Sequence, residues 1–435
     1  MIELKREFVC SCGKIHKLSI DNLFVGKGVI SSVNDCVKKY NAKKVFMLAD
    51  KNTYTAAGEK VCKILKDNYI DFVKYVFNVD SLEPDERAVG SAIMHYDYTC
   101  DMIIGVGSGV INDIGKILSK CVNKPYVIVA TAPSMDGYAS ASSSMSMDGL
   151  KISLSSKSAD IIIGDVDILK NAPTKMLMSG LGDMLAKYIS ICEWRISNVI
   201  TGEYYCEEIA DMVRKSLKKC IDNAHNLLKR DETAVEAVFE GLVICGAAMS
   251  YAGLSRPASG VEHYFSHIWD MRGLEFGTPV STHGIQCAIG TLYAAKIYEK
   301  LKEIKPNNEK ALNEVKSFDY EKYCEFLRKF LGKGAETMIA LESKEGKYDT
   351  YEHGKRLGLI IDNWDKITEI ISEEIPTLDE LLKTYDEVDM PKTEEEIGLT
   401  SDIVYPTFCA TKDIRDKYVL SRLCWDLGII DEITF

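Results

Sequence analysis

The chain has 435 residues, of which 46% are hydrophobic and 27% charged. These proportions are those of a globular protein, and the length corresponds to two or three domains. The formal net charge of −12 excludes a nucleic-acid binder held by many phosphate contacts. It also implies that an anionic ligand binds only where the site is locally positive.

The first part of the chain alternates between strand-like and helix-like patterns. Strands are predicted at 44–48 (ending at Asp50), 71–77, 101–106 and 125–130, with a helix at about 56–68. This alternation predicts an α/β domain over residues 1–172, with a parallel sheet covered by helices and a Rossmann-like capacity to bind a dinucleotide.

Helical patterns take over after about residue 173. They cover 180–197, 206–229 and 233–254, and residues 300–400 are rich in Lys and Glu, as solvated helix faces are. An all-helical domain is therefore predicted over 173–435. No membrane span is expected, because the longest apolar stretch, residues 241–254, is too short.

Fourteen cysteines are spread along the chain with no signal peptide before them, so reduced thiols and a cytoplasmic location are expected. One segment groups three soft ligands, Cys10-Ser11-Cys12-Gly13-Lys14-Ile15-His16. These could hold a metal, but a fourth ligand is missing and Cys-x-Cys is tighter than the usual zinc spacing. The favoured interpretation is an N-terminal hairpin with incidental thiols.

A glycine-rich turn is the strongest local signal. Gly107, Ser108 and Gly109 follow a predicted strand and begin a predicted helix. Glycines let the backbone approach a ligand closely, and the N–H groups at a helix start favour phosphate or pyrophosphate. The spacing matches neither the Rossmann fingerprint nor a Walker loop, and a tight turn without function is the alternative.

Two further segments end predicted strands, where α/β sheets bind their ligands. Asp50 stands where a dinucleotide's ribose is often bound, although it could equally cap a helix. Thr131–Tyr138 follows the fourth strand, and its Asp136 beside Gly137 could also be an ordinary turn residue.

Candidate metal ligands lie in the helical half. Asp183 and Lys187 are spaced i, i+4 on one predicted helix face, and apolar neighbours predict that Asp183 is buried, where a carboxylate needs a partner or a cation. Three of the seven histidines, His263, His267 and His283, fall within twenty-one residues. Spacing alone selects His263 and His267 as a ligand pair, with His283 third, for one divalent metal.

Four ordered motifs together resemble one protein family. They are the glycine turn, Thr131–Ser140 (TAPSMDGYAS), Gly180–Tyr188 (GLGDMLAKY) and Ser255–His263 (SRPASGVEH). They resemble the sn-glycerol-1-phosphate dehydrogenase branch of the superfamily of glycerol dehydrogenase, iron-type alcohol dehydrogenase and dehydroquinate synthase, over most of the chain. Val110 departs from the pattern, because relatives often carry Thr there.

The resemblance implies a dehydroquinate synthase-like fold and a set of site residues. The metal ligands it implies are Asp183, His263 and His283, which makes His267 a catalytic or second-layer residue instead of a ligand. Asp136 would be catalytic and would contact the substrate. Asp183 and Lys187 would also bind the substrate. The residues implied for the dinucleotide are Asp50, Gly107, Ser108, Gly109, Asp113, Thr131, Ser134 and Ser140.

The implied activity is the interconversion of dihydroxyacetone phosphate and sn-glycerol 1-phosphate by a homodimer that uses NAD(H) or NADP(H) and one divalent metal. Zinc is the first expectation, and nickel or iron fits the same ligands. Asp50 favours NAD, while Lys51 could accept the 2′-phosphate of NADP.

Two alternatives remain. One is a glycerol dehydrogenase that acts on the unphosphorylated polyol, and the other is a non-catalytic nucleotide-binding or metabolite-sensing protein. A dehydroquinate synthase fits less well, because that branch usually has Glu at the position of Asp183. Candidate cations for the phosphate are Lys151, Lys187 and Arg256.

Overall fold

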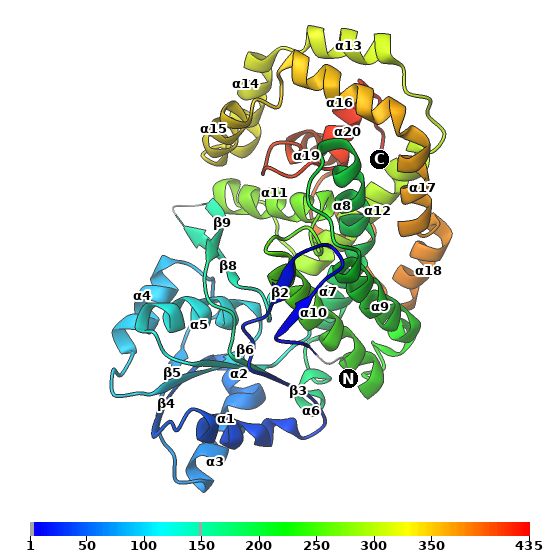
Figure 1. Cartoon of the computed structure of the whole chain (residues 1–435). Helices are drawn as coiled ribbons and strands as arrows, with labels where there is room; N and C mark the ends of the chain where they lie inside the picture. Colours follow the sequence, from blue (N-terminus) through cyan, green and yellow to red (C-terminus); the bar gives the residue numbers. More distant parts are fainter. Residues whose placement is uncertain (1–3, 148–149) are drawn as a thin grey trace. The chain divides into compact units, whose positions relative to one another are not determined.

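A computed structural model describes residues 4–147 and 150–435. The chain divides into two compact units (Figure 1). Unit 1 comprises Met1–Met184 and Asp211–Leu254, and unit 2 comprises Leu185–Ala210 and Ser255–Phe435. Each unit is described by itself below. The predicted change from alternating to helical structure near residue 172 falls inside unit 1, which also contains two long helices that follow the sheet.

The centre of unit 1 is a six-stranded parallel sheet, which confirms the predicted α/β fold. Its order is β3-β10-β7-β6-β4-β5. The strands are β3 (Asn22–Gly26), β4 (Lys44–Asp50), β5 (Asp71–Phe77), β6 (Met102–Gly107), β7 (Tyr126–Ala130) and β10 (Ile161–Asp165). Four of them lie where the sequence predicted strands. The other two, β3 and β10, are short and were not predicted.

Helices cover both faces of this sheet (Figure 1). One face carries α1 (Val33–Lys39) and α3 (Glu59–Asp67), and the other carries α4 (Glu86–His95) and α5 (Gly109–Val122). A short α2 (Lys51–Thr53) and a π-helical turn (Tyr54–Gly58) lead into α3. Alternate strand residues pack against α1 and α3 in a fully buried core, which includes Val45, Met47, Ile104, Val106, Val127, Val129 and Ile163.

Smaller elements complete unit 1. Two antiparallel hairpins pair β1 (Glu7–Val9) with β2 (Ile15–Lys17) and β8 (Ser142–Met147) with β9 (Leu150–Ser155). The helices are η1 (Val29–Ser32), α6 (Val166–Leu169), α7 (Thr174–Leu185), α9 (Glu207–Asn223), η3 (Ala224–Asn226) and α10 (Glu232–Ala252). The last residue of α7, Leu185, and the first residues of α9, 207–210, are assigned to unit 2.

Helix α10 is longer than the apolar stretch that the sequence suggested. Its 21 residues are long and apolar enough to cross a membrane by length and composition. However, 78% of its most apolar window is buried inside the protein, as expected of a core helix.

Unit 2 is helical throughout its described elements. They are α8 (Lys187–Thr201), α11 (Val261–Phe276), α12 (His283–Leu301), α13 (Asn308–Ser317), α14 (Tyr320–Leu331), α15 (Gly334–Glu345), α16 (Thr350–Asp362), α17 (Trp364–Glu374), α18 (Leu378–Glu387), η4 (Glu395–Ile397), η5 (Ser401–Ile403), α19 (Val404–Thr411), α20 (Leu420–Asp426) and η6 (Ile430–Glu432). The single helix predicted over 180–197 is wrong in one respect. A turn at Ala186 separates α7 from α8, so Asp183 and Lys187 lie on different helices.

Candidate functional site

The sheet of unit 1 has a switch point between β4 and β6. The chain passes from β4 to β5 on one side and then returns to β6 on the other side. Ala49 pairs with Val106, so Asp50 and Gly107 end neighbouring parallel strands. Ligands of doubly wound sheets bind outside the carboxyl ends of the strands at such a point. The two segments that the sequence selected for a dinucleotide therefore lie side by side.

Asp50 does cap a helix, which was one of its two predicted roles. Its Oδ1 accepts the backbone N–H groups of Asn52 (2.8 Å) and Thr53 (2.9 Å), and the Thr53 hydroxyl bonds back to the Asp50 N–H (3.0 Å). Within the described part of the chain, no hydrogen bond uses its Oδ2. One carboxylate oxygen thus fixes the turn, and the other can accept ribose hydroxyls.

The start of α5 suits an anion. Ser108 is its N-cap but makes no side-chain capping bond, so the first N–H groups of the helix are not used by that hydroxyl. The turn has a steric requirement as well, because a Cβ on Gly107 would lie 2.5 Å from Ile111 Cβ. Asp113, one turn further on, pairs with buried Lys116 at 2.9 Å.

The segment Thr131–Ser140, called the central loop here, is held against α5. The Thr131 N–H donates to the Gly107 carbonyl (3.1 Å). Asn112 Nδ2 (3.1 Å) and Lys116 Nζ (3.2 Å) both donate to the Gly137 carbonyl. Sequence reasoning missed both of these residues, because a polar side chain inside a helix carries no sign of which distant carbonyl it will reach.

Two helices approach the central loop very closely. A Cβ on Gly180 of α7 would lie 1.8 Å from the Pro133 carbonyl oxygen, and a Cβ on Gly246 of α10 would lie 2.6 Å from that of Asp136. Ser179 also donates to the Ser134 carbonyl at 3.0 Å. The first glycine of the Gly-Leu-Gly-Asp motif is therefore explained by packing, since it lets the helix that carries Asp183 contact the loop.

Asp183 and Asp136 meet in unit 1. The Asp136 N–H donates to Asp183 Oδ2 at 2.9 Å, and the two side chains have carboxylate oxygens within 4.8 Å of each other. Asp183 is fully buried and Asp136 nearly so. Two buried carboxylates this close repel one another unless a cation is near or a proton is taken up. This donor set fits a divalent metal.

Unit 2 brings the three predicted histidines together. The ring of His263 lies 5.0 Å from that of His283 and 6.5 Å from that of His267, centroid to centroid. His263 is on α11, where its Nδ1 contacts the Glu262 carboxylate at 2.7 Å. His283 begins α12, and its Nδ1 contacts Ser266 Oγ at 3.0 Å. With Nδ1 used in this way, Nε2 is the nitrogen that each ring offers to a metal.

A thiol that the sequence reasoning missed joins this group. Ligand atoms of His263, His283 and Cys287 lie within 4.8 Å of one another, and His267 is not in that set. Burial raises the pKa of the Cys287 thiol, but electrostatic interactions and hydrogen bonds with His263 and His283 together outweigh it, so the net pKa is lowered. The i, i+4 spacing from His283 is the sequence signal for Cys287, and it is weak because small buried cysteines are common.

Two buried glutamates support α11. Glu262 Oε1 accepts the Gly260 N–H (2.7 Å), and Glu193 Oε2 accepts the Val261 N–H (3.0 Å). Burial, with the charge of Glu262 nearby, raises the pKa of Glu193 to about 8. Glu262 also contacts the His263 ring, so the two glutamates together fix the start of α11 and the position of His263.

Most of the basic side chains predicted to bind phosphate instead bind groups of the protein itself. Arg256 is buried and binds Glu203 (2.9 Å), the Tyr418 carbonyl (2.8 Å) and Ser197 Oγ (3.1 Å), so its guanidinium holds the structure of unit 2. Lys187 donates to the Ala258 carbonyl at 2.9 Å. Lys51, considered for a 2′-phosphate, pairs with exposed Asp80. Lys151 lies on β9.

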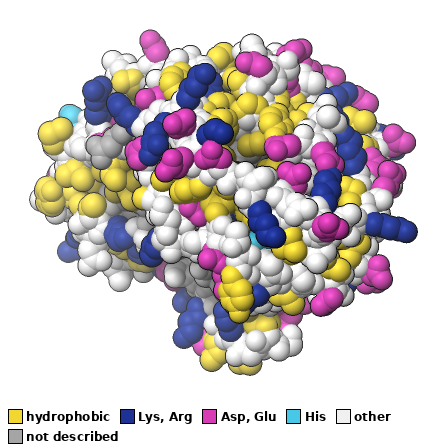
Figure 2. All heavy atoms as spheres, turned by 90° about the horizontal axis from the view of Figure 1, so that it is seen from above, with side chains coloured by type: hydrophobic (Ala, Val, Ile, Leu, Met, Phe, Trp, Pro, Cys, Tyr) yellow, Lys and Arg dark blue, Asp and Glu magenta, His cyan; other side chains and the backbone are white. Residues whose placement is uncertain are grey.

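Surface charges of both signs are interspersed on the face drawn in Figure 2. On that face the described Lys and Arg side chains alternate with Asp and Glu instead of gathering in a band.

The chain resembles known proteins at three levels. Residues 24–173 match the family model described as iron-containing alcohol dehydrogenase. A glycerol-1-phosphate dehydrogenase [NAD(P)+] of Halalkalibacterium halodurans is 31% identical over 294 residues, which are 67% of this chain and 74% of that protein. A protein of the same name from Thermococcus sibiricus is 32% identical over 292 residues, 65% of this chain and 81% of that one.

Solved structures show the same fold. The crystal structure of a probable glycerol dehydrogenase from Sinorhizobium meliloti aligns over 95% of this chain and 98% of its own, with a TM-score of 0.58 and 15% identity. At that identity the likeness concerns the fold alone.

Proposed function

The chain belongs to the glycerol-1-phosphate dehydrogenase family, and from that premise we propose that it interconverts dihydroxyacetone phosphate and sn-glycerol 1-phosphate with NAD(H) or NADP(H). The observation that supports this most directly is the central loop. It is bonded at Thr131 to the glycine turn at the end of β6 and at Asp136 to the carboxylate of Asp183. The segments proposed for the dinucleotide and for the metal are thus joined within one loop.

The residues proposed for the two cofactors follow from the resemblance and fit the donor groups present. Asp50 would bind the adenosine ribose, Gly107–Gly109 the pyrophosphate, and Thr131, Ser134 and Ser140 the region near the nicotinamide, with Asp113 beside the turn. Asp183, His263 and His283 would ligate the metal, for which zinc, nickel and iron are all suitable. When bound, the metal polarises the ketone oxygen as a Lewis acid and the nicotinamide exchanges the hydride.

The protein's own residues supply the proton and the orientation. As the ketone is reduced, its oxygen takes up one proton, and the oxidation releases it. Asp136 and His267 are the proposed donors, because each stands beside a proposed ligand, Asp183 and His263 respectively. Glu262 holds the His263 ring by its Nδ1, so the opposite nitrogen would be the one that ligates a metal.

Binding two anionic ligands on a chain of net charge −12 requires local positive charge. The start of α5 supplies part of it, and the divalent ion supplies more. Lys187 is retained as a proposed substrate contact, whereas Arg256 is excluded by its three internal partners.

A steady-state assay tests the proposal. Metal-stripped enzyme is restored with zinc, nickel or iron, and dihydroxyacetone phosphate is reduced with NADH and with NADPH in parallel. We expect activity that depends on the metal, with a product that has the sn-1 configuration. A protein active on dihydroxyacetone but not on its phosphate would be a glycerol dehydrogenase. A protein that binds NADH but reduces neither ketone under any combination would overturn the proposal.

Two accompanying proposals need separate measurements. A homodimer is proposed from the resemblance, and sedimentation or light scattering tests it. A cytoplasmic location is proposed because all fourteen cysteines are thiols and not disulfides; cell fractionation tests it.

A further inference from the structure

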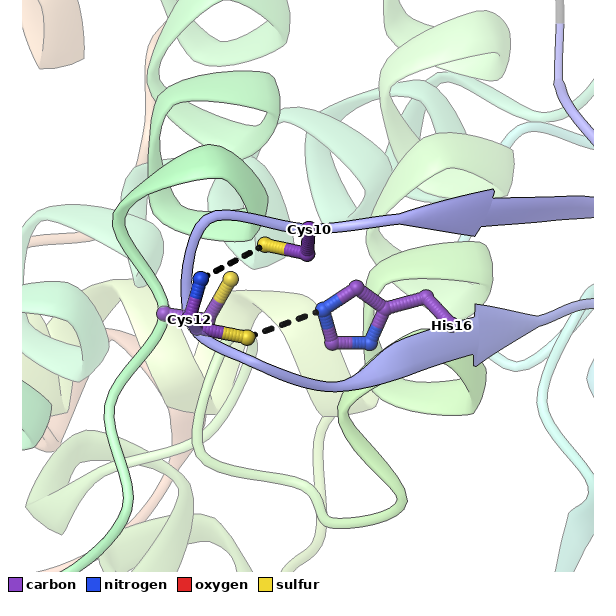
Figure 3. Close-up of side chains that lie close together, drawn as sticks. Cys10, Cys12 and His16 are labelled. Atoms are coloured by element: carbon purple, nitrogen blue, oxygen red, sulfur yellow. Dashed lines mark hydrogen bonds between the residues drawn. The ribbon is translucent and has the colours of Figure 1, made fainter.

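The N-terminal hairpin places Cys10, Cys12 and His16 together (Figure 3). Cys10 and Cys12 lie in the turn between β1 and β2, and His16 is the middle residue of β2. The turn is closed by the Gly13 N–H to the Cys10 carbonyl and the Cys10 N–H to the Lys14 carbonyl, both 3.0 Å. Ligand atoms of the three residues lie within 4.8 Å of one another. The three side chains point toward one another, with Cys12 at the turn and Cys10 and His16 on its two arms (Figure 3).

The spacing of the ligand atoms suits a tetrahedral ion. Zinc lies about 2.3 Å from sulfur and about 2.0–2.1 Å from an imidazole nitrogen, which separates the two ligand atoms by roughly 3.6 Å. Cys12 Sγ and His16 Nε2 are 3.4 Å apart. This distance is compatible with a shared zinc ion, but a thiol-to-imidazole hydrogen bond has the same length. The surroundings of the His16 ring distinguish the two.

Those surroundings fix which nitrogen of His16 faces the sulfur atoms. Nδ1 lies 2.7 Å from the Tyr251 carbonyl. A carbonyl oxygen only accepts, so Nδ1 is the nitrogen that donates to it, and Nε2 is the nitrogen that faces Cys12. This arrangement, with one ring nitrogen bonded to a carbonyl and the other directed at soft ligands, is typical of histidines that ligate metals.

Two members of the group are buried, and Cys12 is partly exposed. His16 is 1% exposed and Cys10 is 5% exposed. The Phe8 ring packs on His16 (4.9 Å between centroids) and on Tyr251 (5.2 Å), and the Cys12 N–H donates to Cys10 Sγ at 3.4 Å. An N–H directed at sulfur stabilises a thiolate, which is the form that binds metal.

We propose that Cys10, Cys12 and His16 bind a zinc ion that stabilises the N-terminal hairpin against the end of α10, where Tyr251 lies. This ion is additional to the metal of the proposed catalytic set. Its donors are two thiolates and one imidazole, which select zinc over the harder cations. Zinc is four-coordinate, so a water or a further protein group completes it. The incidental-thiol interpretation of this segment is the alternative that the experiments below test.

Metal stoichiometry and sulfur ligation test the proposal. Wild-type enzyme loaded with zinc should contain two ions per chain, and zinc-edge X-ray absorption should show a sulfur shell at about 2.3 Å. Cys10→Ser/Cys12→Ser should lose one ion and the sulfur shell, and melt at a lower temperature. Cys121→Ser, at an exposed cysteine, is the matched control and should keep both ions.

A second experiment separates this site from the catalytic set. His263→Ala/His283→Ala should retain one zinc with the full sulfur shell, whether or not the variant is active. If the double cysteine variant is insoluble, cobalt loading of this histidine variant serves instead and should give thiolate-to-cobalt charge-transfer absorption. A sulfur shell that survives Cys10→Ser/Cys12→Ser would assign the sulfur to Cys287 and overturn the proposal. A wild-type protein whose bound zinc shows no sulfur shell, or in which Cys10 and Cys12 are joined in a disulfide, would overturn it as well.

Discussion

The side chain of Asp183 binds the main chain of Asp136: its Oδ2 accepts the Asp136 N–H at 2.9 Å, and Asp183 is fully buried. A carboxylate has about four lone-pair positions. One side chain can therefore position the central loop and still ligate a metal, so the two roles can be tested separately.

The two roles of Asp183 should separate in a pair of variants. Asp183→Asn keeps an oxygen for the Asp136 N–H but loses the charge, so metal occupancy of the proposed catalytic set and turnover should both fall by at least tenfold while stability changes little. Asp183→Ala leaves that buried N–H without its acceptor, which costs about 1–3 kcal/mol in addition. Metal analysis and denaturant unfolding measure both effects. Asp222→Asn, exposed on α9, is the control. Full metal content in Asp183→Asn would refute the ligand assignment.

Gly180 should tolerate no side chain. In Gly180→Ala the new Cβ would lie 1.8 Å from the Pro133 carbonyl oxygen, so α7 or the central loop must move. Overpacking of this kind costs about 1–3 kcal/mol, and the displaced loop should lower turnover as well. Gly354→Ala in α16 has open space at its Cβ and should be neutral or stabilising by up to about 1 kcal/mol. Equal stability of the two variants would contradict the close approach.

His267 should affect catalysis without affecting metal content. His267→Ala removes a proposed proton donor, and we expect turnover to fall by roughly 10²–10⁴-fold with metal near the wild-type level. The pH profile of turnover should change with it. His225→Ala, at an exposed histidine in η3, should change neither quantity. Loss of the metal in His267→Ala would make His267 a ligand, as its spacing from His263 first suggested.

Lys412 should make stability depend on pH above neutrality. Burial lowers its pKa to about 8, despite the charge of Asp413 and the Tyr323 ring, whose centroid lies 3.3 Å from the ammonium. Between pH 8 and the ordinary lysine range the unfolded chain holds more protons than the folded one, so stability rises with pH over that window. The gain is on the order of 3 kcal/mol and is absent below pH 8.

Lys412→Met isolates this contribution. The difference in unfolding free energy between wild type and variant should shift in favour of wild type as pH is raised from 7.5 to 10.5. Lys366→Met, an exposed lysine of α17, should show no such shift. A flat difference for Lys412→Met would mean that the ammonium stays charged in the folded protein.

The sequence by itself determined the α/β class of the first part of the chain and the position of four of the six strands in its parallel sheet. Period and composition identify long, strongly apolar strands such as β4 and β6, because each is buried on both faces. The four motifs also identified the family, since they are ordered and specific together. The edge strand β3 escaped because its half-exposed residues carry little pattern.

Only the tertiary structure decided how each polar side chain is used. Arg256 and Lys187 bind carbonyls and carboxylates within their unit, whereas Cys287 joins His263 and His283, and His16 turns its Nε2 toward Cys12. A residue's partners depend on contacts between segments far apart in the chain, such as His16 with Tyr251. Local pattern encodes which face is buried, but it does not encode which distant carbonyl or carboxylate meets a given donor.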